Sequence, residues 1–310
     1  MIRVGTAGYS YPGPPPQGWY GVFYPKIRRR GFDELEYYSR FFNTVEINST
    51  FYRPPVSSMA EAWVRKTPSN FEFAVKVWQK FTHARKIGEE VGEAKREWEA
   101  PTQADVELFR RGIDAVAESG KLGALLFQYP PGFHFTEENV ERLGWTLKAF
   151  KTYPKVVELR HRSWSDSANE TTALLKESAA SWAVIDEPKF ASSVKQEFAP
   201  VGKILYLRLH GRNQEKWWRH NEAWERYDYC YGPEEIRYFG DRIKEVAKNS
   251  PGAKIYVVFN NHARGQAVTN GLMLMHEVGQ GRAAALPRSL IEAYPQLAEC
   301  AEVTAEETLF

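Results

Sequence analysis

The sequence predicts an α/β fold of the (β/α)8 TIM-like barrel type, and three observations support this class. Short runs rich in β-branched and aromatic residues alternate with helical patterns along the chain, which indicates a parallel sheet covered by helices. The length of 310 residues suits one such barrel without requiring a second domain. No glycine-rich dinucleotide loop follows the first run, which disfavours a doubly wound open sheet.

Eight segments have the composition of buried strands. They are residues 2–6, 44–48, 72–77, 123–128, 155–160, 181–186, 204–210 and 254–260. Between them, helices are marked most clearly by apolar residues at i, i+3, i+7 and i+10, which is the spacing of one helix face. These residues are Val106, Phe109, Ile113 and Val116; Val140, Leu143, Leu147 and Phe150; and Ile236, Phe239, Ile243 and Val246. Each stripe is expected to pack against the sheet.

Two connections depart from the regular alternation. The connection between the sixth and seventh strands, residues 187–203, contains two prolines and no helix stripe, so it is expected to be irregular. A long charged segment, residues 83–100, follows the third strand and indicates an inserted loop or helix at the rim. We expect one barrel domain at residues 1–280 and a C-terminal extension at 281–310 that packs on the barrel or trails from it.

Charge and cysteine content narrow the class of protein. The formal net charge is only +2, so a broad basic footprint for duplex nucleic acid is absent. Cys230 and Cys300 lie far apart and outside any CxxC spacing, which suits a reducing cytosol and gives no cysteine-type zinc site. We find no signal peptide and no apolar stretch of membrane-spanning length, so we expect a cytoplasmic protein without a membrane partner.

Polar side chains mark the ends of most predicted strands. In a helix-covered barrel, alternate strand residues face the helices and the interior. Alternation places one polar set inward, near the carboxyl ends: Glu46, Asn48, Lys76, Gln128, Glu158, Arg160, Arg208, His210 and Asn260, with Asp186 ending the sixth strand. Buried charges are costly unless paired or functional, and barrel enzymes keep their chemistry at this end. The pattern predicts a ligand or catalytic site at the mouth; the alternative is a salt-bridge network that only closes the barrel.

Several ordered motifs lie on these strands and the loops that follow them. They are GTAGYSY (5–11), FNTVEINSTFY (42–52), FAVKVWQKFTH (73–83), LLFQYPP (125–131), VELRHRSW (157–164), YLRLHG (206–211) and VVFNNHARGQAVTN (257–270). Together they resemble the YecE-like family (domain of unknown function family 72) over about residues 2 to 276, with the tail after about residue 280 outside the resemblance. The resemblance implies a TIM-type barrel with a site at the strand ends, but no particular reaction. The family usually has an acidic residue after the paired asparagines of the last strand, where this chain has His262.

Glu46, Glu158 and His210 are the candidate catalytic residues. A carboxylate at a strand end can act as a general acid or base, and an imidazole can serve as the second acid–base group. The alternative is that each carboxylate only balances a neighbouring cation, with Lys76 or Arg208 as the partner of Glu46 and an adjacent arginine as the partner of Glu158.

The candidate substrate-binding residues are polar or aromatic side chains at strand ends and in the loops that follow. They are Tyr9, Asn48, Lys76, Gln128, Arg160, Trp164, Asp186, Arg208, Asn260, Asn261 and Arg264. The cations among them would neutralise an anion, and the planar fork of an arginine suits a carboxylate or phosphate. Gly265, with Arg212 and Arg264 nearby, could form a phosphate site where a helix begins, as barrels often do after their last strands. The alternative is an ordinary turn.

Aromatic residues cluster in two predicted loops. The segment KWWRHNEAW (216–224) interleaves tryptophans with cations and could form a lid or a stacking platform for bases or sugar rings. The alternative is that its tryptophans pack on the barrel. The first loop, with Tyr9, Tyr11, Trp19 and Tyr20, presents the same choice.

These observations favour an enzyme of the hydrolase or isomerase type that acts on an anionic, phosphorylated or carbohydrate-like substrate at the barrel mouth. We expect no organic cofactor, and no metal, because the inward cations would repel a divalent ion placed among them. Two alternatives stay open. One is a protein that binds or processes nucleic acid through its aromatic–basic loops, and the other is a non-catalytic binder of an anionic metabolite.

Overall fold

The computed structural model describes residues 1–83, 100–281 and 283–303. Its parallel strands are β1 (Ile2–Thr6), β2 (Thr44–Ile47), β3 (Glu72–Lys76), β4 (Leu122–Gln128), β5 (Lys155–Glu158), β6 (Ala180–Trp182), β7 (Val184–Asp186), β8 (Ile204–Leu209) and β9 (Lys254–Phe259). Every predicted strand segment therefore contains a strand. The sixth segment differs, because Ala183 divides it into β6 and β7.

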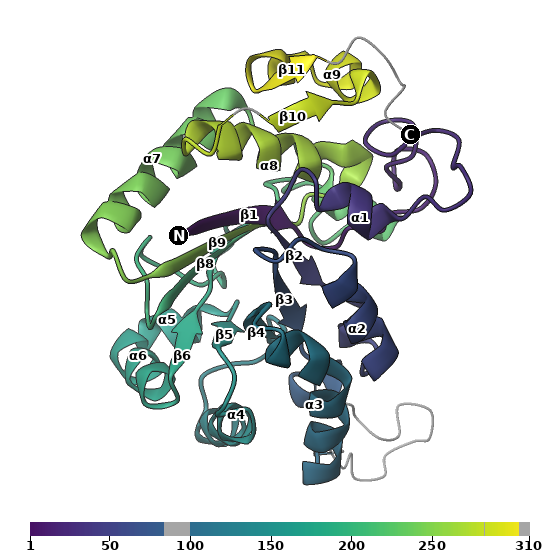
Figure 1. Ribbon diagram of the computed structural model, residues 1–310. Coiled ribbons are helices and arrows are strands. Elements are labelled where there is room, and N and C mark those ends of the chain that lie inside the picture. Colours follow the sequence, from purple (N-terminus) through teal and green to yellow (C-terminus); the bar gives the residue numbers. More distant parts are fainter. Residues whose placement is uncertain (84–99, 282, 304–310) are drawn as a thin grey trace.

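The strands form two parallel sheets, where the sequence predicts one closed barrel. One sheet has the order β1-β9-β8-β7 and the other β2-β3-β4-β5-β6. Hydrogen bonds link the two sheets at both junctions: Gly8 N, after β1, donates to Glu46 O of β2 at 2.8 Å, and Ile204 N of β8 donates to the Ser181 hydroxyl of β6 at 3.0 Å. Figure 1 shows the strands at the centre of the molecule with helices around them.

The helices that surround the strands are α1 (Glu34–Tyr38), α2 (Ser57–Arg65), α3 (Gln103–Glu118), α4 (Glu137–Ala149), α5 (Arg162–Asp166), α6 (Ala168–Glu177), α7 (Pro233–Asn249) and α8 (Gln266–Glu277). Short 3-10 turns lie at η1 (Ser49–Phe51), η2 (Gln79–Phe81), η3 (Ala223–Tyr227), η4 (Ala263–Gly265) and η5 (Pro295–Glu299). The three predicted stripes fall on α3, α4 and α7 and face the core, which confirms the helical reading. In the described part of the chain, no helix has the length and apolarity needed to cross a membrane.

Strand alternation separates two apolar clusters, as the sequence predicts. The outer cluster joins strand residues such as Val75, Leu125 and Leu207 to the helices. The inner cluster is smaller and consists of Ala7, Ala74, Ala124, Leu126, Val156, Ala183, Ile204, Tyr206, Tyr256 and Val258. Because the inner residues are mostly small or aromatic, they fill the space between the sheets below the polar residues at the carboxyl ends.

The irregular segments are only partly as expected. Residues 187–203 contain no helix or strand, which confirms the predicted irregular connection. The predicted rim insertion at 83–100 lies almost wholly outside the described residues. The C-terminal segment forms β10 (Ala283–Leu286), α9 (Arg288–Ala293) and β11 (Ala301–Val303) beside α8 (Figure 1). It contacts the loop after β1, where Ser289 Oγ donates to Val22 O at 2.9 Å.

Candidate functional site

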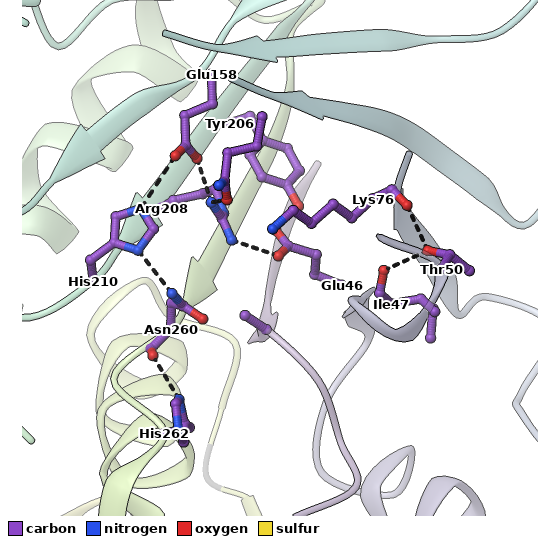
Figure 2. Close-up of polar contacts among 12 residues, drawn as sticks. Glu46, Ile47, Thr50, Lys76, Glu158, Tyr206, Arg208, His210, Asn260 and His262 are labelled. Atoms are coloured by element: carbon purple, nitrogen blue, oxygen red, sulfur yellow. Dashed lines mark hydrogen bonds and ion pairs between the residues drawn. The ribbon is translucent and has the colours of Figure 1, made fainter. Parts of the chain in front are cut away.

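Arg208 lies at the centre of a buried ionic cluster at the carboxyl ends of the strands (Figure 2). Its Nη2 donates to Glu46 Oε1 at 2.7 Å, and its Nη1 donates to Gln128 Oε1 at 2.9 Å and to Glu158 Oε2. The second oxygen of Glu46 accepts from the Tyr206 hydroxyl at 2.9 Å. Alternation along β8 places Arg208 inward, and both carboxylates are 0% exposed, so one guanidinium balances two buried negative charges.

A second arginine, Arg160, pairs with Glu158. Arg160 Nε donates to Glu158 Oε1 at 2.7 Å, so each carboxylate oxygen accepts from a guanidinium. Burial by itself would raise the pKa of Glu158, but Arg208 and Arg160 outweigh it and hold that pKa well below its usual range. A carboxylate with so low a pKa, whose two oxygens both accept from arginines, is a poor proton acceptor. This favours the role of Glu158 as a partner of the arginines over a role as general acid or base.

His210 is a neutral imidazole inside the cluster. The side-chain amide of Asn260 contacts its Nδ1 at 2.9 Å, and Arg160 Nη2 lies 3.3 Å from its Nε2. The same Nε2 lies 3.7 Å from Glu158 Oε1, so it accepts from Arg160 in one neutral tautomer and faces the carboxylate as a donor in the other. Burial and the Arg160 charge together lower the pKa of His210 to about 3. We therefore assign His210 a hydrogen-bonding role near neutral pH.

Lys76 is the cation of the cluster that lacks an ion-pair partner among the described residues. Its Nζ lies 4.0 Å from the centre of the Phe51 ring, and the side chain is only partly exposed at the end of β3. Burial and the nearby Arg208 lower the pKa of Lys76 to about 7, against a smaller opposing effect of Glu46. The lowered pKa makes the neutral amine of Lys76 more accessible near neutral pH than that of an ordinary lysine.

Aromatic side chains lie beside this cluster. The ring of Tyr11 stacks on His262 with centroids 4.7 Å apart, and Tyr227 lies 5.2 Å from His262 and 6.5 Å from His210. Trp217 packs 6.4 Å from His210. These residues come from three loops that follow β1, β8 and β9, so the aromatic wall is assembled only by the fold. The position where the resemblance predicts an acid, His262, is part of this wall.

The structure brings most of the sequence-predicted residues together. Eight of the inward residues form one connected or adjacent set: Glu46, Lys76, Gln128, Glu158, Arg160, Arg208, His210 and Asn260. Asn48 follows β2, and its buried Oδ1 has no hydrogen-bond partner. This convergence agrees with the inward alternation that the sequence predicts.

Asp186 lies outside the Arg208 cluster and has its own partners. Arg212 binds both of its oxygens, with Nη2 at 2.8 Å from Oδ1, and the Tyr231 hydroxyl donates to Oδ2 at 2.7 Å. The residue that enters the cluster is the next one, Glu187, which lies 3.6 Å from Arg160 and is 6% exposed. Alternation counted from the inward Ala183 predicts this shift, because it places residue 185 and then residue 187 on the inner side.

Asn261 and Arg264 also lie apart from the cluster. The Asn261 amide donates to Tyr229 O and to Asn270 Oδ1, both at 2.8 Å, and so holds the loop before α7. Arg264 is half-exposed and pairs with Asp228 at 3.3 Å. A shallow polar groove of about 690 Å³ is lined by Arg212, Asn213, Gln214, Glu215, Asp228 and Tyr229. Both arginines already have carboxylate partners, so the predicted phosphate site at these arginines is not supported.

Trp164 packs in the core, and Tyr9 packs against α1 while it stays partly exposed. Trp164 is 0% exposed, stacks on Phe133, and donates from Nε1 to Phe133 O at 2.7 Å. Tyr9 packs against Tyr38 of α1 with ring centroids 6.5 Å apart. An aromatic residue in a short motif has the same sequence signature whether it binds a ligand or fills the core, so the sequence does not separate these roles.

The tryptophan-rich segment 216–224 has one tryptophan packed in the core and one exposed at the surface. Trp217 is 2% exposed and packs inside, whereas Trp218 is 55% exposed and lies 5.6 Å from the Phe190 ring. Lys216 pairs with Glu225 at 3.1 Å. The segment is therefore partly core and offers one exposed ring.

Sequence reasoning missed His83 as well as Glu187. His83 lies two residues after the end of η2 and is edge-on to Phe51 at 5.0 Å, and its pKa is lowered to about 4 by burial and by Lys76 and Arg160. His83 is the last residue of the FAVKVWQKFTH motif, and its place in that motif could have identified it as a candidate site residue. Within the described residues, no group of His, Cys, Asp and Glu is arranged to hold a metal ion.

Comparisons with known proteins agree with the resemblance and extend it. The model of the family described as "Protein of unknown function DUF72" matches residues 3–293, which is further than the predicted end near residue 276. The UPF0759 protein YunF of Bacillus subtilis is 29% identical over 299 residues, 94% of this chain and 99% of that protein.

The solved structures that are similar to this chain include proteins of the same family. A DUF72 family protein from Thermotoga maritima is 32% identical, with a TM-score of 0.73, and the match covers 89% of this chain and 98% of that one. A DUF72 family protein from Enterococcus faecalis is 26% identical, with a TM-score of 0.73 and coverage of 90% and 95%. With a family match over nearly its whole length, this chain belongs to the DUF72 family.

Proposed function

We propose that the protein is an enzyme of the hydrolase or isomerase type that binds an anionic, phosphorylated or carbohydrate-like substrate at the carboxyl ends of its strands. One observation carries this proposal. In the described residues, Lys76 has no carboxylate within ion-pair distance, although buried cations in proteins are usually paired. An incoming anion would supply the missing partner.

The proposal includes closure of the two sheets into one TIM-like barrel. Hydrogen bonds across both junctions support closure, since Ala7 N donates to Phe259 O at 2.9 Å while its neighbour Gly8 donates to β2. At the other junction, Ile204 N of β8 donates to the Ser181 hydroxyl of β6 at 3.0 Å. Closure places all the carboxyl strand ends around one mouth, as in barrel enzymes.

The proposed roles follow from charge and hydrogen bonding. Arg160 and the protonated form of Lys76 attract the anion, and the neutral form of Lys76, which its lowered pKa makes accessible, accepts a proton from the substrate. Glu187 is the proton donor, because burial raises its pKa against the weaker opposing effect of Arg160. Asn48 Oδ1, buried without a partner, accepts from a substrate hydroxyl. Glu46 and Glu158 hold Arg208 and keep the site in shape.

Inorganic phosphate tests the anion site. We expect phosphate to raise the melting temperature of the wild-type protein in a saturable way, since a ligand that binds only the folded state stabilises it. The same titration on Lys76→Met should show no saturable response. The measurement is thermal unfolding followed by circular dichroism, with sodium chloride at equal ionic strength as the reference.

Lys203→Met is the matched control, because Lys203 is exposed at the amino end of β8. It should respond to phosphate like the wild type. Equal responses in all three proteins would place the anion elsewhere and contradict the proposal.

A second candidate function, nucleic-acid binding, is favoured by one exposed loop. The loop after β1 carries Lys26, Arg28, Arg29 and Arg30 in succession around an exposed Ile27, and in the described structure none of these cations forms an ion pair. A short run rich in lysine and arginine is typical of segments that contact nucleic-acid phosphates.

Single-stranded DNA tests this candidate. If the loop binds it, affinity should fall with salt, and replacing Lys26, Arg29 and Arg30 by serine should reduce the slope of log K against log salt by about 0.7 per lost phosphate contact. Fluorescence anisotropy of a labelled oligonucleotide gives this slope. Replacing Lys151, Lys203 and Lys248, which are exposed near the amino ends of the strands, should leave the slope unchanged. An unchanged slope in the loop variant would exclude the candidate.

A further inference from the structure

Lys76 has the surroundings of a nucleophile. Resting on the proposed function, we infer that the Lys76 amine forms an imine with the carbonyl carbon of an aldehyde or ketone that also carries an anionic group. The substrate class is thereby narrowed from anionic molecules in general to anionic carbonyl compounds, such as phosphorylated sugars in their open-chain form.

Comparison with two other lysines of the same sheet supports this inference. Lys121 is 7% exposed, and its Nζ donates to Val64 O and Thr67 O at 2.8 Å and to the Thr67 hydroxyl at 3.0 Å. Lys155 is 2% exposed and contacts three backbone carbonyls at 3.3 to 3.4 Å. Burial lowers the pKa of both lysines, but each nitrogen already contacts several oxygen acceptors, which leaves it less available for attack on a substrate.

Lys76 differs from both in what its nitrogen contacts. Among the described residues its Nζ has the face of the Phe51 ring at 4.0 Å and no hydrogen-bond acceptor or carboxylate partner. Its backbone is held in place, because Thr50 Oγ1 donates to Lys76 O at 2.6 Å and to Ile47 O at 3.1 Å (Figure 2). A fixed strand end with an unsaturated amine is the arrangement that lysine nucleophiles require.

The neighbouring charges favour the neutral amine. Arg208 and Arg160 lie on the same side of the cluster and disfavour a third cation, and burial acts in the same direction. The nearby His83 is uncharged near neutral pH and does not compete for the anionic group. That group would lie against Arg160, whose terminal nitrogens have, among the described residues, only Glu187 at 3.6 Å and His210 at 3.3 Å as partners.

The step is balanced without an additional reactant. The lone pair of the Lys76 nitrogen forms a bond to the carbonyl carbon, and the electron pair of the C=O π bond moves to oxygen. The two hydrogens of the amine then leave with that oxygen as water, and a carbon–nitrogen double bond remains. Hydrolysis by water reverses the step and restores the lysine.

Reductive trapping tests the inference. The full-length protein is incubated at pH 7 with limiting glycolaldehyde phosphate and sodium cyanoborohydride, and adducts are located by peptide mass spectrometry. We expect the adduct at Lys76 to exceed that at the exposed Lys203 by at least about tenfold, because the neutral fraction of an ordinary lysine is far smaller at this pH. Excess inorganic phosphate should suppress the Lys76 adduct and leave the Lys203 adduct unchanged. Lys76→Arg should lose the adduct and keep the fold, checked by circular dichroism.

The outcomes separate this inference from the function on which it rests. If phosphate stabilises the protein through Lys76 but no adduct forms there, the imine is excluded and the anion site stands. If phosphate has no effect but Lys76 is still labelled preferentially by unphosphorylated glycolaldehyde, the amine is a nucleophile and the anionic part of the substrate class is wrong. If neither effect occurs, both the inference and the proposed function fail.

Discussion

Replacing Arg208 with methionine is expected to lower the free energy of unfolding by about 3–5 kcal/mol, because it leaves Glu46 and Glu158 in the interior without their shared cation. Arg208 is 1% exposed, so solvent cannot take its place. Methionine fills a similar volume, and the loss therefore reports the uncompensated charge more than a cavity. Urea denaturation followed by circular dichroism measures the change.

Two further variants test whether the loss of stability comes from the buried charges. Arg242→Met removes a half-exposed cation that pairs with Glu245 on α7 and should cost no more than about 1 kcal/mol. Adding Glu46→Gln to Arg208→Met removes one of the unpaired charges and should restore part of the lost stability. If Arg208→Met were as mild as Arg242→Met, the buried cluster would not have the electrostatic role that we describe.

Acid is expected to destabilise the protein from about pH 6.5 downward, through His210. The pKa of His210 is lowered to about 3 in the folded protein and is near 6.5 in the unfolded chain. Between these values the unfolded chain binds a proton that the folded protein does not, so unfolding is favoured as pH falls. The stability contributed by neutral His210 is complete above pH 6.5 and is lost toward pH 3, at up to about 1.4 kcal/mol per pH unit.

The measurement is the unfolding free energy of the wild type and of His210→Gln at several pH values. Glutamine does not titrate, so the variant should show a shallower slope between pH 6.5 and 4, whatever its absolute stability. The remaining slope comes from groups such as Glu158, whose lowered pKa acts in the same direction at more acidic pH. His276→Gln, at an exposed position on α8, should keep the wild-type slope. Equal slopes in all three proteins would show that His210 titrates normally.

The sequence predicts the strands, the helix stripes and the inward polar set well, because each depends on a local period. Leu205, Leu207 and Leu209 face the outer cluster, while Tyr206 and Arg208 face inward, as a two-residue period requires. Only the sixth strand segment was misread. The break at Ala183 is a departure from regular pairing that composition does not reveal.

Local sequence patterns do not predict the role of a residue when that role depends on which side chain it contacts. Asp186 and Glu187 are adjacent acids, yet one is bound by Arg212 and the other lies by Arg160. Composition does not separate these roles, and the alternation that does separate them depends on the break at Ala183, which only the structure shows. Trp164 shows the same limit, since its place in the core follows from the position of Phe133.

The sequence by itself determined which side chains point inward, because alternation is a property of one strand. The tertiary structure decided which of them neutralise each other, because Coulomb energy and hydrogen bonding depend on distance and burial. Glu46 and Arg208 lie 162 residues apart in the chain, yet Arg208 Nη2 lies 2.7 Å from Glu46 Oε1 in the fold. Because both oxygens of Glu158 are taken by arginines, Lys76 is left, among the described residues, as the unmatched charge of the site.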